Sequence, residues 1–245
     1  MKMKIRQGRA KGLFGNKGAE GRLGNVPKYI KQILKKKKKV KVLEVGTGYG
    51  RALLELKNLF GDRVETYGIN AEPEWNQKLV KKYALHEKLF DKQNINKNLP
   101  KIFILDAGKK LPFKNNFIDL IINPATMQYI PDKIHFIEES NRILTKEGIA
   151  ALELEEVRNE HPLEYKNLFE IWDNGVKVDF LKYLKKFKNI KIKKSKNRPW
   201  HYILITKVKK LDFKLKYITS INLEEQFSSN WEIRWWGKKS IYVVK

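Results

Sequence analysis

The feature that most constrains the fold is an alternation of short apolar runs with amphipathic segments between residues 40 and 154. Apolar runs of strand length occupy 40–45, 64–69, 102–105, 117–122 and 149–154. Segments with apolar residues at helical spacing lie between some of these runs, at 51–60, 74–89 and 133–144. Parallel strands need crossovers of helix length, so this alternation predicts an α/β fold with a parallel sheet covered by helices on both faces.

The pattern changes after Glu156. Residues 163–172 and 178–187 have helical spacing, and the runs 190–194 and 202–208 are typical of an antiparallel pair. Adding this pair to the five earlier strands predicts a seven-stranded, mostly parallel sheet with an antiparallel last strand. We divide the chain into an N-terminal arm with a short helix (1–39), a central domain (40–208) and a basic, aromatic C-terminal extension (209–245).

The first 28 residues are basic and regularly interrupted by glycine. The glycines are Gly8, Gly12, Gly15, Gly18, Gly21 and Gly24. No helical or strand period is visible at that spacing, so we expect a mobile or ligand-ordered arm. A short helix is predicted after Pro27, and the lysine run 35–39 follows it on a solvated face.

The charge of the chain indicates the kind of partner it meets. There are 52 Lys and Arg residues against 27 Asp and Glu residues, a net charge of +25, and most of the excess is lysine. Such a field favours polyanions, and lysine suits contact with a nucleic-acid backbone better than base readout. A lysine-favouring codon bias is the alternative, although it should also raise glutamate.

Composition also excludes several classes of site. The chain has no cysteine and only four histidines, which lack ligand spacing, so neither disulfides nor a metal site are expected. No apolar run reaches the roughly 18 residues that a membrane span requires. We therefore expect a soluble, cytoplasmic protein with no membrane partner; the sequence leaves the oligomeric state open.

The segment Val-Leu-Glu-Val-Gly-Thr-Gly-Tyr-Gly at 42–50 carries the clearest chemical signal. Glycines allow a sharp turn and a close approach of the backbone to a ligand. A dinucleotide site would need a glycine where Arg51 stands. Glu44 would repel a pyrophosphate, whereas it would attract a cationic ligand.

This segment resembles the first motif of class I S-adenosylmethionine-dependent methyltransferases, an acidic residue followed by G-x-G-x-G. The resemblance implies a Rossmann-like fold and S-adenosylmethionine as the cofactor. It also implies that Gly46, Gly48 and Gly50 wrap the methionine end, while Glu44 holds the ammonium group directly or through water.

Further matches follow in family order. The second strand normally ends in an acid that binds both ribose hydroxyls; here that position is Asn70, and Glu72 is the alternative ligand. The acid that accepts from the adenine amino group corresponds to Asp106, with the Ala107 backbone beside it. The segment from Glu139 to Gly148 resembles the family turn before strand five, and its implied role is structural. The resemblance covers about 41–155, with a generic match up to 208.

The fourth strand opens toward the reaction site at Asn123-Pro124. Amino-methylating nucleic-acid enzymes of this fold carry Asn/Asp-Pro-Pro-aromatic here, but Ala125-Thr126 lacks the aromatic ring. The generic methyltransferase branch is therefore favoured, with Asn123 retained as a site residue.

Because the cofactor is already activated, catalysis requires mainly placement of the acceptor and exclusion of water. We assign no catalytic residue; Glu155, Glu156 and His161 are candidate bases, better explained as solvated or capping residues. The favoured hypothesis is methyl transfer to a nucleic acid, RNA in particular. The alternatives are a methyltransferase for a small metabolite or a protein, and a non-catalytic scaffold with a degenerate cofactor fold.

Overall fold

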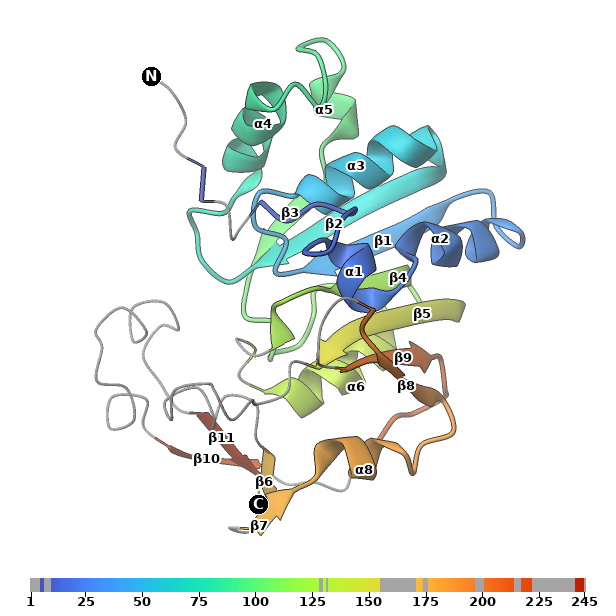
Figure 1. Cartoon of the computed structure of the whole chain (residues 1–245), viewed down its shortest axis with the longest axis vertical. Coiled ribbons are helices and arrows are strands. Elements are labelled where there is room, and N and C mark those ends of the chain that lie inside the picture. Colours follow the sequence, from blue (N-terminus) through green and yellow to red (C-terminus); the bar gives the residue numbers. More distant parts are fainter. Residues whose placement is uncertain are drawn as a thin grey trace.

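The computed structural model describes residues 5–6, 10–127, 130, 132–154, 171–173, 176–196, 201–213, 217–221 and 241–244 (Figure 1). The helices are α1 (Ala19–Leu23), α2 (Val26–Leu34), α3 (Arg51–Phe60), α4 (Gln77–His86), α5 (Ile95–Asn98), α6 (Lys133–Ile143) and α8 (Phe180–Leu184). The strands of the main sheet are β1 (Val40–Val45), β2 (Val64–Asn70), β3 (Lys101–Ile104), β4 (Ile118–Asn123), β5 (Leu144–Leu154), β8 (Ile190–Lys194) and β9 (His201–Thr206).

The main sheet has seven strands in the order β3-β2-β1-β4-β5-β9-β8. The first five strands are parallel neighbours, whereas β9 is antiparallel to both β5 and β8. The predicted Rossmann-like sheet with an antiparallel last strand is confirmed. Since β1, β2 and β4 run parallel, their carboxyl ends meet at one edge, where ligands bind in folds of this kind.

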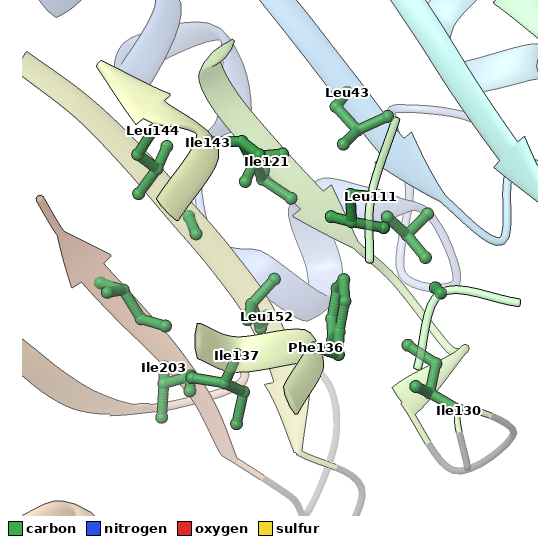
Figure 2. Close-up of a cluster of buried hydrophobic side chains, with 14 of the residues drawn as sticks. Leu43, Leu111, Ile121, Ile130, Phe136, Ile137, Ile143, Leu144, Leu152 and Ile203 are labelled. Carbon is green, nitrogen blue, oxygen red and sulfur yellow. The ribbon is translucent and has the colours of Figure 1, made fainter. Parts of the chain in front are cut away.

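Two apolar layers cover the sheet. Helices α1, α2 and α3 lie on one face of the sheet (Figure 1). They pack against alternate residues of the strands, such as Val42 and Leu120. On the other face, α6 and α8 cover the intervening residues. Figure 2 shows Ile121, Phe136 and Leu152 converging in this second layer. Burial on both faces explains why β4 is apolar at almost every position.

The predicted turn before strand five is wrong in detail. Helix α6 passes directly into β5, and the pairing with β4 shifts from Ile118↔Leu144 to Leu120↔Ile149. Gly148 does not have a positive φ angle. A Cβ at this position would lie 2.9 Å from Leu144 Cδ2. Close packing inside an irregular strand, rather than a left-handed turn, therefore requires this glycine.

The helices predicted at 163–172 and 178–187 are also partly wrong. Residues 163–170 lie outside the described residues, and 171–173 (β6) pair antiparallel with 176–178 (β7). Only the shorter α8 confirms the second helix. The apolar residues in these short runs fit both a helical and a strand period, and the pairing between β6 and β7 determines that the runs form strands.

Residues 1–28, for which we expect a mobile or ligand-ordered arm, contain regular structure in the part that the structure describes. Residues 12–18 turn back into α1, and Leu13 and Leu23 are fully buried against α3 and the sheet. The Gly12 and Leu13 carbonyls accept from Ala19 N and Glu20 N at 3.0 and 2.9 Å. These bonds satisfy N–H groups that a short helix would otherwise leave unpaired.

Two glycines of this segment, Gly18 and Gly21, are packing positions, whereas Gly15 and Gly24 have positive φ angles of 84° and 77°. A Cβ at Gly18 would lie 2.2 Å from the Phe14 carbonyl oxygen, and one at Gly21 would lie 2.6 Å from that of Asn16. The regular glycine spacing, which hid any helical period, is what lets α1 sit on the loop before it. The short helix predicted after Pro27 is confirmed as α2.

The C-terminal extension is described in part. Leu211 and Phe213 are buried, and the Phe213 ring lies 4.9 Å from that of Phe187. Residues 217–221 (β10) and 241–244 (β11) form a separate antiparallel pair, and Trp231, Trp235 and Trp236 lie outside the described residues. No helix in the described part of the chain is long and apolar enough to cross a membrane.

Candidate cofactor and acceptor site

The glycine loop, residues 46–50, joins β1 to α3 at the carboxyl edge of the sheet. Gly46, Gly48 and Gly50 have φ values of 77°, 53° and 74°, a conformation that residues with a side chain rarely adopt. Gly46 N donates to the Ile69 carbonyl at 2.8 Å, and Gly50 N donates to that of Thr47 at 2.8 Å. The predicted glycines therefore form a tight turn anchored to β2 directly before a helix N-terminus.

Glu44 lies buried beneath this loop, 3% exposed. Burial raises the pKa of Glu44 to about 8, although the Thr47 hydroxyl donates to Glu44 Oε2 at 2.7 Å and opposes this shift. A carboxyl group in this state gains its charge most readily when a cation arrives beside it. Glu44 thus has the chemistry predicted for binding an ammonium group.

Asn70 ends β2 and holds the glycine loop in place. Its Oδ1 accepts from Gly48 N at 2.8 Å, while its Nδ2 donates to the Trp75 carbonyl at 2.7 Å. Both ends of the amide therefore have backbone partners, which gives Asn70 a positioning role in the structure. Glu72, half-buried in the loop after β2, remains the alternative ribose ligand.

Asp106 and Ala107 follow β3 on the same edge. Leu105 N donates to the Asn70 carbonyl at 2.9 Å and so joins the ends of β2 and β3. Asp106 Oδ1 accepts from Gly108 N at 2.8 Å, as in a turn-capping residue, and Ala107 is buried. The predicted adenine side of the site thus lies beside the predicted ribose side.

Residues 123–126, which we call the acceptor loop, leave β4 toward the glycine loop. Asn123 is fully buried, and neither its Oδ1 nor its Nδ2 has a hydrogen-bond partner among the described residues. Ala125 has a positive φ of 55°, and a Cβ on Gly46 would lie 2.0 Å from Thr126 Oγ1. An unpaired buried amide costs about 1–3 kcal/mol, which keeps Asn123 a candidate for contact with a polar ligand.

The sequence interpretation missed two charged residues behind this loop. Arg22 of α1 forms a buried ion pair with Glu153 of β5, with Arg22 Nη1 2.6 Å from Glu153 Oε1. Glu153 Oε2 also accepts from Ala125 N. A signal existed, because Glu153 is the single acid in the apolar run 149–154.

The remaining sequence predictions concern the candidate bases and a metal site. Glu155, Glu156 and His161 lie outside the described residues. No group of three His, Cys, Asp or Glu side chains suited to a metal occurs within the described ranges.

The residues at this edge fit S-adenosylmethionine. A cradle of positive-φ glycines, a buried carboxyl group that favours a cation, and an acid at the end of β3 lie around the carboxyl ends of β1, β2 and β3. When bound, the cofactor supplies a methyl group on a sulfonium, which is activated for attack by a nucleophile. Glu44, the glycine loop and Asp106 would hold it.

Comparison with known proteins agrees with this reading. Residues 43–152 match the family model of the methyltransferase domain. No curated protein matches the chain in sequence. The match covers less than half of the chain, and together with the sheet topology it shows a methyltransferase domain in residues 43–152. In this segment the chain is similar to S-adenosylmethionine-dependent methyltransferases, and the residues at the carboxyl edge fit that cofactor.

Similar solved structures are more distant. A SAM-dependent methyltransferase from Aquifex aeolicus shares 19% identity at a TM-score of 0.44, covering 72% of this chain and 89% of that one. A TehB-like SAM-dependent methyltransferase from Corynebacterium glutamicum shares 13% identity at a TM-score of 0.44, covering 75% and 89%. YcgJ from Bacillus subtilis shares 18% at 0.37, covering 51% of this chain and 50% of YcgJ. This protein covers 44% of the length of a solved chain from Galdieria sulphuraria.

Proposed function

We propose that this methyltransferase transfers the methyl group to a nucleic acid, and to RNA in particular. The observation that carries the proposal is a basic patch around the end of α2. It consists of Lys31, Lys35, Lys36, Lys38 and Arg63, which line two adjoining hollows that have no acidic side chain in their walls. None of these five cations forms an ion pair with another described residue.

The position of the basic patch favours a polymer. Residues 35–39 precede β1, so the patch lies at the amino edge of the sheet, opposite the acceptor loop. The six residues of β1 rise roughly 20 Å between those edges. A nucleic acid can contact both edges at once, whereas a small metabolite cannot.

At the acceptor loop, Asn123 suits an amine on a base. Its Oδ1 can accept a hydrogen bond from an exocyclic amino group and orient the nitrogen lone pair toward the methyl group. The stacking aromatic that follows such residues in nucleic-acid amine methyltransferases is absent, since Ala125 and Thr126 occupy those positions. Base stacking must then come from another part of the chain.

The test is the fate of a labelled methyl group. Labelled S-adenosylmethionine and the full chain are incubated with the RNA, protein and small-molecule fractions of a cell extract. We expect label in RNA that survives protease and is released by ribonuclease. Label confined to the protein or small-molecule fraction would replace the proposal with the alternative acceptor classes. Label in no fraction, with cofactor bound, would favour the scaffold hypothesis.

The contribution of the basic patch is measured by salt dependence. In Lys35→Gln/Lys36→Gln/Lys38→Gln, the slope of log affinity for single-stranded RNA against log salt should fall by about 2, because each lost phosphate contact removes ~0.7. Lys191→Gln/Lys193→Gln/Lys194→Gln, at exposed positions of β8, is the matched control. Equal slopes in both triple variants would show that net charge, and not the basic patch, binds RNA.

A further inference from the structure

We propose that Arg22 and Glu153 are positioning residues through which the N-terminal segment holds the acceptor loop in its reactive shape. The proposal rests on the proposed function only in placing the acceptor at Asn123. Its first ground is the isolation of the ion pair from solvent: the Arg22 and Glu153 side chains are 5% and 1% exposed, with Nη1 and Oε1 2.6 Å apart. A pair buried this deeply binds tightly in one geometry.

The second ground is where the other carboxylate oxygen points. Glu153 Oε2 accepts from the backbone N–H of Ala125, in the middle of the acceptor loop. Ala125 has a φ of 55°, a conformation that an alanine does not adopt without support. The charge-assisted bond from Glu153 supplies that support and sets the loop between Asn123 and Thr126.

The third ground is the anchoring of Arg22. Its Nε donates to the Lys17 carbonyl at 3.3 Å, and its own carbonyl accepts from Ser195 Oγ at 2.8 Å. Arg22 therefore connects the folded N-terminal segment, the residue after β8 and the acceptor loop through Glu153. Displacement of α1 would remove the positive charge from Glu153 and release Ala125.

Stability alone does not require this arrangement. A buried ion pair is often replaceable by apolar side chains without loss of stability. An apolar residue at position 153 could not bind Ala125 N, whereas a carboxylate can hold both partners at once. The loop that it holds also carries Asn123, whose amide has no partner among the described residues, and Thr126, which contacts the glycine loop.

The experiment compares hydrogen exchange at Ala125 in the full chain and in Arg22→Met, together with S-adenosylmethionine binding by calorimetry. We expect exchange of the Ala125 amide to accelerate at least tenfold, while the Kd for S-adenosylmethionine changes less than threefold. Where RNA is methylated, kcat should fall at least tenfold without a matching change in KM for the cofactor. Arg22→Lys, which retains the charge, should recover part of both losses, and it replaces Arg22→Met if that variant does not fold.

Arg142→Met is the matched control, since Arg142 also pairs with a glutamate, Glu139, at 2.6 Å but holds residues 111–115 instead. It should leave Ala125 exchange unchanged. Unchanged Ala125 exchange in folded Arg22 variants, or equal acceleration in Arg142→Met, would overturn the proposal. The exchange readout needs no acceptor, so it stands or fails independently of whether RNA is the substrate.

Discussion

Two glycine-rich regions of this protein use glycine for opposite purposes. In the glycine loop, Gly46, Gly48 and Gly50 take positive φ angles and open the backbone toward a ligand. In the N-terminal segment, Gly18 and Gly21 have ordinary φ angles but press against backbone carbonyls of the preceding loop. Glycine spacing alone does not separate the two regions: the positive φ angles of Gly46, Gly48 and Gly50 suit a ligand turn, whereas Gly18 and Gly21 are packing positions. Substitutions that affect stability or binding, but not both, test this difference.

The largest effect is expected from Leu13→Ala, since Leu13 is fully buried. Truncating a buried leucine costs about 2–5 kcal/mol, which urea denaturation should detect. The neighbouring Phe14→Ala is the control: Phe14 is 53% exposed, so its loss should change stability little. Equal costs for both variants would mean that the N-terminal segment does not pack as described.

Gly46→Ala and Gly18→Ala should separate binding from packing. In Gly46→Ala, the added Cβ would meet the Thr126 side chain, and the backbone φ of 77° at this position disfavours any side chain. We therefore expect the Kd for S-adenosylmethionine to rise about 100-fold, or ~2.7 kcal/mol. Gly18→Ala should instead lower the urea midpoint and leave the Kd within threefold. Calorimetry and denaturation on both variants check this; the reverse pattern would contradict the assignment.

Asn70 tests how the glycine loop is held. Asn70→Ala loses the bonds to Gly48 N and the Trp75 carbonyl, so cofactor binding should weaken about tenfold, the scale of a lost hydrogen bond. Asn70→Asp should also weaken binding, because a carboxylate cannot donate to the Trp75 carbonyl. If the aspartate variant binds more tightly while Glu72→Ala has no effect, residue 70 contacts the ribose directly.

Glu44 should make cofactor binding depend on pH. Because burial raises its pKa to about 8, the group is largely protonated at neutral pH, and binding the cofactor's ammonium favours the carboxylate. Affinity should therefore rise by at most tenfold per pH unit up to about 8, with release of a proton. Calorimetry in two buffers of different ionisation enthalpy measures that proton, and Glu44→Gln should abolish its release.

The same raised pKa affects stability with the opposite sign. The pKa of Glu44 is lower in the unfolded chain than in the folded protein. At pH values between these two pKa values, the upper of which is about 8, the unfolded chain therefore binds fewer protons. Without cofactor, the stability contributed by Glu44 should therefore decrease as pH rises through this window. A stability profile of Glu44→Gln lacking that decrease is the expected control.

Much of the fold could be predicted from the sequence because its signals are local. The apolar runs that became β1, β2 and β4 and the periodic segment of α3 need only the chemistry of a buried parallel sheet. The glycine loop was also predictable, since the acid and glycines of a ligand turn lie within seven residues, 44–50.

Only the tertiary structure decided what depends on contacts between distant residues. Arg22 and Glu153 lie 131 positions apart, and no local pattern pairs them. Asn70 is predicted as a ribose ligand from its position, but only the folded chain shows that Gly48 and Trp75 bond its amide. The N-terminal glycines are typical of a mobile arm in the sequence, and only the structure shows that Gly18 packs against the Phe14 carbonyl. In each case the partner is chosen by packing of separate elements, which residue type and spacing do not encode.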